Sequence, residues 1–413
     1  MDRKRILIII GIVALIIAFA ATIYFVIFRK QTKVASDLPA LNESEQQRLQ
    51  LTNEERAAGV TEDQKIQQYV AEKRKEIALQ AETAVTNKYR VIPVLNQKSI
   101  SPTLSADFSK LIFYSPENKE FYVANLDGSQ PSPITSSAID KVYDISWSKK
   151  KDRAVMTLSD NQGLTRNYLI FDINNQKQTP VDPNFKSPTL SPDGEKIAYL
   201  FKDKASGTSN ISVSNLDGTN WNSVSPFEGE FPIINWNLES KLLYYSEPST
   251  QTNATAFSAN IIGKSFNQLV SDFGLNVNIS NDGNKIVYSG QNVSSATTTN
   301  LQFYDVLANK NVDLGVQTFA DKCTWLPDNQ NLICAIPENL SKCMILPDAY
   351  NNYNFVSKDS FFKVDTQNNK TTKLADTSLF AQDYDVFKPF MLGEKIMYFT
   401  RRQDGLLYAF VIP

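Results

Sequence analysis

The chain has 413 residues, of which 42% are hydrophobic and 21% are charged, and its formal net charge is −2 with an isoelectric point near 5.6. This length and composition fit one large globular domain with additional segments, and the charge balance gives no reason to expect nucleic-acid binding. The chain contains no histidine, which excludes a Ser-His-Asp triad, a Cys-His pair and any histidine-bound metal.

The first predicted element is a transmembrane anchor at residues 6–28, preceded by a short basic tail at residues 1–5. The segment is uncharged and long enough, as a helix, to cross a hydrocarbon core of about 30 Å. A cleaved signal peptide is the alternative, since Ala-Phe-Ala at 18–20 has the form of a cleavage site, but the apolar run continues beyond it. Basic residues flank both ends, so the positive-inside rule barely discriminates. We expect an uncleaved, single-pass anchor with the following domain on the extracytoplasmic side.

Residues 29–87 predict a linker and juxtamembrane helices. A polar stretch is followed by a Glu-, Gln- and Arg-rich segment that Gly59 ends, and Thr-Glu-Asp-Gln at 61–64 has the pattern of a helix start. The second helix should continue to about Ala84. Its apolar stripe is thin, which favours a spacer or a helix that leans on the next domain, and a coiled-coil stalk is the alternative.

Seven copies of a short unit follow. In each copy an apolar residue precedes a polar turn and a second apolar run, as at residues 190–200, where the turn is Ser-Pro-Asp-Gly. Proline, aspartate and glycine favour such turns, and a period of about 40–45 residues with several short strands is typical of propeller blades. The sequence therefore predicts an all-β, seven-bladed β-propeller over residues 88–413, preceded by the transmembrane helix and the helical segment. The residues that align the copies are Leu104, Trp147, Leu190, Trp236, Ile279, Trp325 and Phe390.

The seventh copy is predicted to be completed by a strand from the other end of the domain. It has three strands before Pro413, whereas the other six have room for a fourth. The stretch at residues 88–95 is strand-like and otherwise unassigned, and Pro93 suits an outermost strand, which is a sheet edge. We expect this stretch to close the last blade; an apolar linker is the alternative.

These units resemble the WD40-like repeats of TolB-type propeller proteins from bacterial envelopes. The resemblance rests on Ser-Pro-Asp-Gly-Glu-Lys-Ile-Ala-Tyr at 191–199 and on Ser-Asn-Asp-Gly-Asn-Lys-Ile-Val-Tyr at 280–288, and it covers about residues 88–413. TolB-like proteins carry a six-bladed propeller behind a small α/β domain, whereas here seven blades follow a membrane segment. The resemblance implies an extracytoplasmic, non-catalytic protein that binds other macromolecules.

Two of the three cysteines are predicted to form a disulfide. Cys323 and Cys334 flank one turn symmetrically, outside Trp325 and Leu332. If Trp325 faces Leu332 across the hairpin, the cysteines face each other at a Cα separation of about 4.5 Å, which is within disulfide reach. Such a bond agrees with an oxidising compartment, and buried free thiols in a cytosolic protein are the alternative. Cys343 is left over, either buried or bonded to another chain.

The sequence predicts no catalytic residue, no cofactor and no metal site. It has neither a dinucleotide-binding glycine motif nor a P-loop. Turn aspartates such as Asp193 and Asp282 suit Ca²⁺, but turn chemistry alone explains them. A carboxylate glycosidase needs a specific pair of acids, and none stands out.

The candidate partner-binding region is an insertion in the sixth blade, at residues 337–359. Long ordered loops on rigid scaffolds often carry function, and aromatic residues are enriched at the centres of interfaces. Tyr350, Tyr353 and Phe355 are the rings that this loop could present to a partner. The alternative is that these rings hold the insertion against the propeller.

The favoured function is a membrane-anchored, non-catalytic scaffold of the cell envelope that binds a protein or an envelope polymer. One rival is a hydrolase or lyase acting on envelope polymers with carboxylates in the central channel. Acidic residues lining the channel would favour that rival, and neutral residues would count against it. A purely structural surface component is the other rival.

Overall fold

The computed structural model describes residues 91–412, except residues 136, 160–165, 264, 292, 294–296, 341–343, 353–354 and 381. The predicted basic tail, anchor, linker and juxtamembrane helices all lie outside these residues, as do residues 88–90, Cys343 and Tyr353. Within the described part of the chain, no helix is long and apolar enough to span a membrane.

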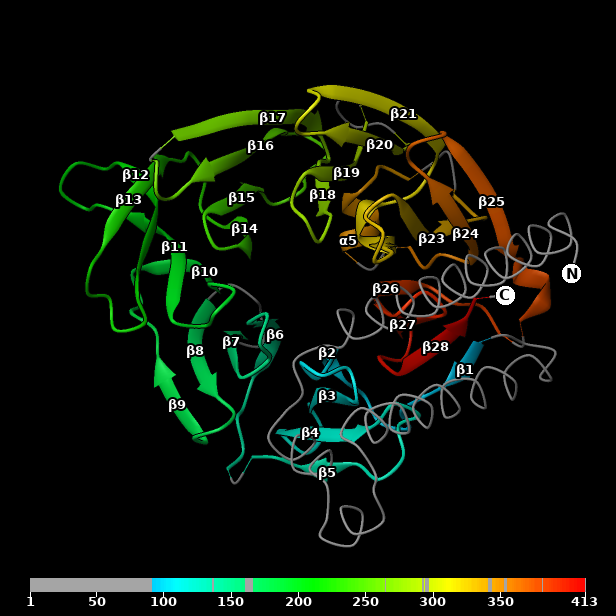
Figure 1. Ribbon diagram of the computed structural model, residues 1–413, viewed down its shortest axis with the longest axis horizontal. Helices are drawn as coiled ribbons and strands as arrows, with labels where there is room; N and C mark the ends of the chain where they lie inside the picture. Colours follow the sequence, from blue (N-terminus) through cyan, green and yellow to red (C-terminus); the bar gives the residue numbers. More distant parts are fainter. Residues whose placement is uncertain are drawn as a thin grey trace, which may run out of the picture. The chain divides into compact units, whose positions relative to one another are not determined.

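Seven four-stranded antiparallel sheets form the domain and confirm the all-β, seven-bladed propeller (Figure 1). The innermost strands of blades one to seven are β2 (Ile100–Leu104), β6 (Val142–Trp147), β10 (Phe185–Leu190), β14 (Pro232–Leu238), β18 (Asn276–Ile279), β22 (Cys323–Trp325) and β26 (Val386–Leu392). The second strands are β3 (Lys110–Ser115), β7 (Arg153–Ser159), β11 (Lys196–Lys202), β15 (Lys241–Ser246), β19 (Lys285–Gly290), β23 (Asn331–Pro337) and β27 (Ile396–Arg401).

The outer strands follow in the same order within each blade. The third strands are β4 (Glu120–Asn125), β8 (Arg166–Asp172), β12 (Ser209–Asn215), β16 (Asn253–Asn260), β20 (Asn300–Asp305), β24 (Asp359–Asp365) and β28 (Leu407–Val411). The fourth strands of blades one to six are β5 (Ser132–Pro133), β9 (Lys177–Pro180), β13 (Asn222–Pro226), β17 (Ser265–Phe273), β21 (Lys310–Val316) and β25 (Lys370–Ala375). Three short helices complete the described elements: η1 (Ala320–Lys322), α5 (Asp348–Asn351) and η2 (Thr377–Leu379).

The seventh blade takes its fourth strand from the beginning of the domain. Strand β1 (Val91–Pro93) pairs antiparallel with β28, and Val91 lies opposite Phe410. Pro93 occupies the outermost strand, where a missing backbone N–H costs no ladder hydrogen bond on the free side. The predicted closing strand is therefore found, over Val91–Pro93.

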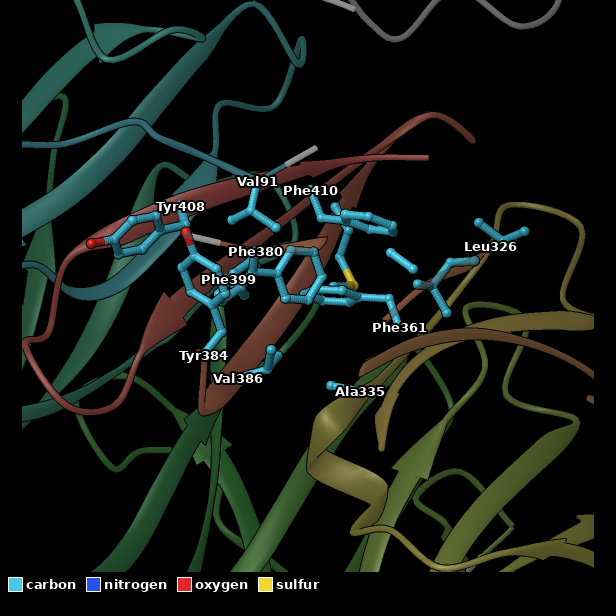
Figure 2. Close-up of a cluster of buried hydrophobic side chains, with 13 residues drawn as sticks. Val91, Leu326, Ala335, Phe361, Phe380, Tyr384, Val386, Phe399, Tyr408 and Phe410 are labelled. Atoms are coloured by element: carbon cyan, nitrogen blue, oxygen red, sulfur yellow. The ribbon is translucent and has the colours of Figure 1, made fainter. Parts of the chain in front are cut away.

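Among the described residues the hydrophobic core forms eight clusters: seven each fill the space between two successive blades, and the eighth lies at the insertion of blade six. Figure 2 shows the cluster between blades six and seven, where Phe361 stacks on Phe410 with ring centroids 4.1 Å apart. The second strand of each blade contributes several buried residues in a row, because both of its faces pack against neighbouring blades. This packing explains the uninterrupted apolar runs after each turn.

The repeated turn is held by side-chain hydrogen bonds to its own backbone. In blade three, the Ser191 hydroxyl donates to Asp193 at 2.5 Å, and the Lys196 amide donates to the Ser191 hydroxyl at 2.9 Å. Gly194 has φ +78°, a conformation that residues with a Cβ rarely adopt. The motif therefore ends the inner strand and starts the second one, which is a structural role and needs no bound ion.

The three tryptophans at the repeat position pack between blades. Trp236 and Trp325 are each 5% exposed. Trp147 packs in the cluster between blades one and two, and its indole N–H donates to the Ser101 carbonyl in blade one at 2.8 Å. Trp221 lies outside the repeat position and is exposed. The repeat-position rings therefore belong to the scaffold.

A disulfide joins Cys323 and Cys334, whose Cα atoms are 4.1 Å apart. The two residues are register partners of β22 and β23, and Trp325 faces Leu332 in the same ladder, as predicted. Both cysteines are buried in the cluster between blades five and six. The bond therefore fastens the innermost strand of blade six to the second strand.

Replacing both cysteines by alanine is expected to lower the free energy of unfolding by about 2–3 kcal/mol, because the cross-link between residues 11 apart in sequence no longer restricts the unfolded chain. Urea denaturation of the oxidised wild type, the reduced wild type and the double variant measures this loss. Reduction should reproduce most of the effect. Equal midpoints for oxidised wild type and double variant would contradict the prediction.

Candidate functional site

A cavity of about 270 Å³ lies against the innermost strands of blades four to seven. In Figure 1, β14, β18 and β26 are at the inner side of the ring, so the cavity belongs to the central channel. Its lining residues are Asn235, Asn237, Val277, Asn278, Ile279, Asp321, Cys323, Lys388 and Pro389. A second cavity, of about 20 Å³ between blades four and five, has room for little more than one water molecule.

Three asparagines give the cavity most of its hydrogen-bonding groups. The Asn278 side-chain amide donates to the carbonyls of Cys323 at 2.7 Å and Ala320 at 3.3 Å. This uses both amide hydrogens and leaves the Asn278 carbonyl oxygen as an acceptor. Within the described part of the chain, the side chains of Asn235 and Asn237 make no hydrogen bond. Their amides can therefore both donate to and accept from a ligand.

Asp321 is the one carboxyl group among these lining residues and comes from η1. Its Oδ1 atom is buried, and none of the described residues forms a hydrogen bond with it. Burial raises the pKa of Asp321, and this outweighs the opposing effect of the nearby Lys322 and Arg402 cations. The side chain therefore keeps its proton to a higher pH than an ordinary aspartate and can then donate a hydrogen bond.

Replacing Asp321 by asparagine is expected to stabilise the protein progressively more, relative to wild type, as the pH rises above about 4. A raised folded-state pKa contributes stability that is fully present below the unfolded pKa and is lost as the pH rises through the folded value. Asparagine resembles the neutral carboxyl and does not titrate. Urea midpoints of wild type and variant between pH 4 and pH 8 measure the difference. A difference that is constant, or that grows toward acid, would contradict the prediction.

Lys388 joins three blades at the channel. Its ammonium lies 2.5 Å from the Asp144 carboxylate of blade two, and this carboxylate also accepts from the Ser101 hydroxyl of blade one at 2.7 Å. Burial alone would raise the pKa of Asp144, but Lys388 and these hydrogen bonds outweigh it and hold the pKa below the ordinary value. Because Asp144 balances the charge of Lys388, the groups left for a ligand are mainly uncharged.

The insertion is held by buried contacts, which corrects the expectation for its aromatic residues. Tyr350 and Phe355 are 2% and 5% exposed, and Tyr350 stacks on Phe319 with ring centroids 4.6 Å apart. These two rings therefore hold the insertion against the propeller and are not available to a partner. Their aromatic character indicated an interface, but the same apolar area serves equally well to fill a core. Tyr353 lies outside the described residues.

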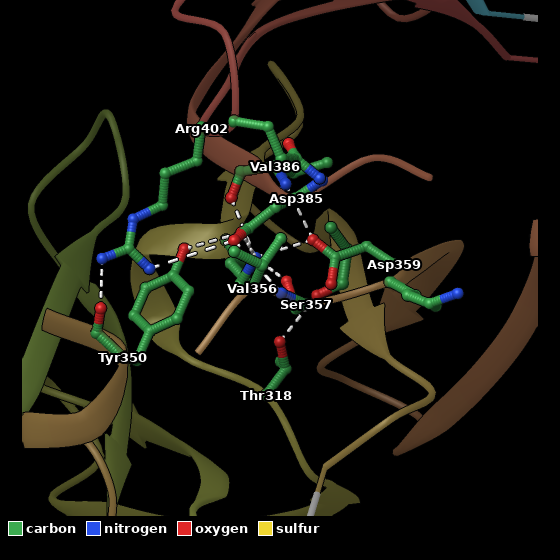
Figure 3. Close-up of polar contacts among 12 residues, drawn as sticks. Thr318, Tyr350, Val356, Ser357, Asp359, Asp385, Val386 and Arg402 are labelled. Atoms are coloured by element: carbon green, nitrogen blue, oxygen red, sulfur yellow. Dashed lines mark hydrogen bonds and ion pairs between the residues drawn. The ribbon is translucent and has the colours of Figure 1, made fainter. Parts of the chain in front are cut away.

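A buried ion network lies beneath the insertion (Figure 3). The Lys322 ammonium is fully buried and donates to Asp359 and Asp385 at 2.7 Å each, and to the Ser357 hydroxyl at 2.9 Å. Burial alone would lower the pKa of Lys322, but Asp359, Tyr350 and Asp385 raise it above the ordinary lysine value. The lysine therefore stays charged and connects η1 to the end of the insertion and to blade seven.

The insertion also reaches two other blades. The Asp348 carboxylate of α5 accepts hydrogen bonds from Thr250 of blade four, at 3.1 Å from its backbone amide and at 2.6 Å from its hydroxyl. Gln291, which follows β19 of blade five, donates to the Leu346 carbonyl. The insertion is thus fixed to blades four, five and seven as well as to its own blade, the same four blades that line the cavity. This attachment holds η1, and with it Asp321, in place.

Apart from Cys323 and Ile279, the residues of the cavity were not singled out in the sequence, although a signal is present. Side chains alternate across a strand, so the residue before each repeat residue faces the other side of the sheet, and at this position Asn235 and Asn278 line the cavity. In six blades that residue is polar: Thr103, Ser146, Thr189, Asn235, Asn278 and Thr324. The hydroxyls of Ser146 and Thr189 indeed meet at 3.3 Å between blades two and three. The inner strands of six blades therefore carry an uncharged polar residue at this position.

The arrangement contains no group of three or more acidic, cysteine or histidine side chains close enough to share a metal ion, as far as the described residues extend. The three cavity amides and the single carboxyl are oxygen and nitrogen groups suited to hydrogen bonding. The geometry of the site is that of a polar binding cavity in a rigid ring.

The fold and this cavity define the chain as a seven-bladed β-propeller with a polar central cavity. No protein-family profile and no curated protein sequence matches it. An oligogalacturonate lyase in complex with manganese is similar in structure, with a TM-score of 0.54 at 14% identity over 78% of this chain and 91% of that chain. An oligogalacturonate lyase from Vibrio parahaemolyticus has a TM-score of 0.53 at 12% identity, with the same coverage. TolB from Acinetobacter baumannii has a TM-score of 0.42 at 13% identity over 65% of this chain and 63% of that chain.

The likeness to the two lyases shows the propeller fold alone, because one fold commonly supports unrelated functions. The function of this chain therefore has to be argued from its own site.

Proposed function

We propose that this protein is a membrane-anchored, extracytoplasmic β-propeller that binds a ligand of the cell envelope without catalysing a reaction. The observation that carries the proposal is the channel cavity, where Asn235 and Asn237 offer amides that make no hydrogen bond within the described part of the chain. The ligand is a protein or an envelope polymer that brings a small polar group into the cavity, and nucleic acid is not expected.

The proposed compartment is supported by the disulfide and by the apolar segment. Disulfides persist in oxidising compartments, and the Cys323–Cys334 bond is part of the core between blades five and six. Residues 6–28 are long enough to anchor the chain in a membrane.

Protease treatment of intact cells that produce the full-length chain tests the compartment. Cleavage at the surface, or after the outer compartment is opened, is expected, together with a Cys323–Cys334 linked peptide in non-reducing mass spectrometry. Full protection in both states, with free thiols throughout, would place the propeller on the cytoplasmic side and overturn the compartment.

Site-specific cross-linking tests the binding role. A photoreactive amino acid at position 237, in the cavity, is expected to yield an adduct in the envelope. The matched control is position 267, an exposed asparagine on β17 of the same blade. Equal yields at the two positions, or none at position 237, would contradict binding in the channel.

A second candidate function, a channel-sited carboxylate hydrolase or lyase acting on envelope polymers, has one observation in its favour. Asp144 and Asp321 both belong to inner elements of the ring, and the pKa is lowered for Asp144 and raised for Asp321. Opposite shifts of two carboxyl groups are a common property of acid–base pairs. Turnover of envelope glycan fragments that is lost in both D144N and D321N would favour this function over binding alone.

A further inference from the structure

We propose that the channel cavity binds one small, uncharged, polyhydroxylated molecule, of which a single neutral sugar residue is the simplest example. The inference rests on the proposed binding function and narrows it to a class of ligand. The sugar residue is either free or the end of a glycan, because the chemistry that the cavity recognises is the same in both.

The hydrogen-bonding groups of the cavity match those of a sugar. Each hydroxyl of a sugar both donates and accepts, and so does a side-chain amide. Asn235 and Asn237 offer complete amides, and Asn278 offers a carbonyl oxygen. A ligand with several adjacent hydroxyls matches these three groups.

The charge of the site favours a neutral ligand. Lys388 is 2.5 Å from Asp144, so its charge is already compensated. A sugar acid or an amino sugar would bring a charge into a cavity whose lining offers no uncompensated opposite charge, and burying an unpaired charge is unfavourable. A metal cation would meet one carboxyl group and the ammonium of Lys388. An uncharged ligand avoids both conflicts.

The size and the lining of the cavity also favour a small, uncharged ligand. Its volume of about 270 Å³ is just under the lower limit of roughly 300 Å³ that is common for small-molecule sites, which suits one small molecule and not a folded segment. Val277, Ile279 and Pro389 supply apolar surface for the C–H face of a sugar ring. The cavity is not lined by an aromatic ring among the described residues, so hydrogen bonds carry the affinity, and we expect a dissociation constant in about the millimolar range.

The test is saturation-transfer NMR with the full-length protein in a detergent that has no sugar headgroup. The neutral probes are glucose, galactose and N-acetylglucosamine, and the charged probes are galacturonate and glucosamine. Saturable binding of at least one neutral probe is expected. N235A and N237A should each weaken binding about three- to tenfold, as for the loss of one or two neutral hydrogen bonds. D321N should bind within about twofold of wild type, because the amide still donates.

Two controls keep the result interpretable. N267A changes the same residue type on the outer strand of blade four and should bind as the wild type does. Each variant must also be fully folded without urea and unfold cooperatively when urea is added, which shows that a loss of binding is not a loss of folding. A final comparison uses a monosaccharide and an oligosaccharide that ends in the same sugar. Equal affinities indicate that the site binds a free sugar, and tighter binding of the oligosaccharide indicates that it binds the end of a glycan.

Two results would overturn this inference. One is tighter binding of galacturonate or glucosamine than of every neutral probe, and the other is wild-type affinity in the N235A/N237A double variant. If no probe binds while position 237 still cross-links to an envelope component, the ligand class is wrong and the proposed binding function stands. If position 237 gives no adduct either, both are wrong.

Discussion

Replacing Lys322 by methionine is expected to lower the free energy of unfolding by about 3–5 kcal/mol, as measured by urea denaturation. The side chains of Lys322, Asp359 and Asp385 are all 0% exposed, and the lysine is within 2.7 Å of both acids. Methionine fills a similar space but removes the cation from Asp359 and leaves Asp385 with the Arg402 guanidinium at 3.9 Å. An uncompensated buried charge costs far more than a surface ion pair contributes.

Lys358 provides the matched control, since it forms an ion pair with Asp383 close to the same network but is half exposed. K358A should cost less than about 1 kcal/mol. Adding D359N to the Lys322 variant should recover part of the loss, because Asp359 then carries no charge, while Asp385 keeps the Arg402 guanidinium 3.9 Å away. A cost of K322M no greater than that of K358A would contradict the assignment of a buried ion network.

Replacing Phe361 by alanine is expected to cost about 3–5 kcal/mol, measured in the same way. Phe361 is 0% exposed in the cluster between blades six and seven, where its ring stacks on Phe410. Removing the ring leaves a cavity that the surrounding strands close only in part, because both blades are held by their own hydrogen-bond ladders. F361A should also loosen the attachment of blade seven.

Phe266, an exposed ring on the outer strand of blade four, is the control for this substitution, and F266A should cost less than about 1 kcal/mol. The F361A/F410A double variant should cost less than the sum of the single ones, since the two rings share one contact. Full additivity would indicate that the two rings do not contribute to a common core.

Much of the fold could be predicted because its determinants are local and repeated. The turn residues and the apolar runs recur once per blade, which gave the number of blades, and strand alternation was enough to place Cys323 opposite Cys334. The closing strand followed from a shortage of strands in the last copy, and β1 pairs with β28 as expected.

The cavity could not be predicted in the same way, because it depends on how seven blades curve around an axis. Asn235 and Asp321 are far apart in sequence and come together only when four blades converge. The orientation of Tyr350 was likewise beyond local pattern, since its hydroxyl donates to Asp385 of another blade and the Arg402 guanidinium lies 3.8 Å over its ring. The sequence of an aromatic-rich insertion does not show whether its rings face solvent or a neighbouring element.

The closure of blade seven sets an order of events during synthesis. Strand β1 is synthesised before any other described strand, whereas its partner β28 is the last described strand to be synthesised. Val91 therefore cannot pair with Phe410 until nearly the whole domain has been produced. Pairings between distant parts of a chain form slowly and leave unpaired edges exposed in the meantime. Six blades can assemble one after another as they emerge, but the ring closes only when β1 pairs with β28. Until then the seventh sheet has an unpaired edge, which a chaperone or another nascent copy is able to bind.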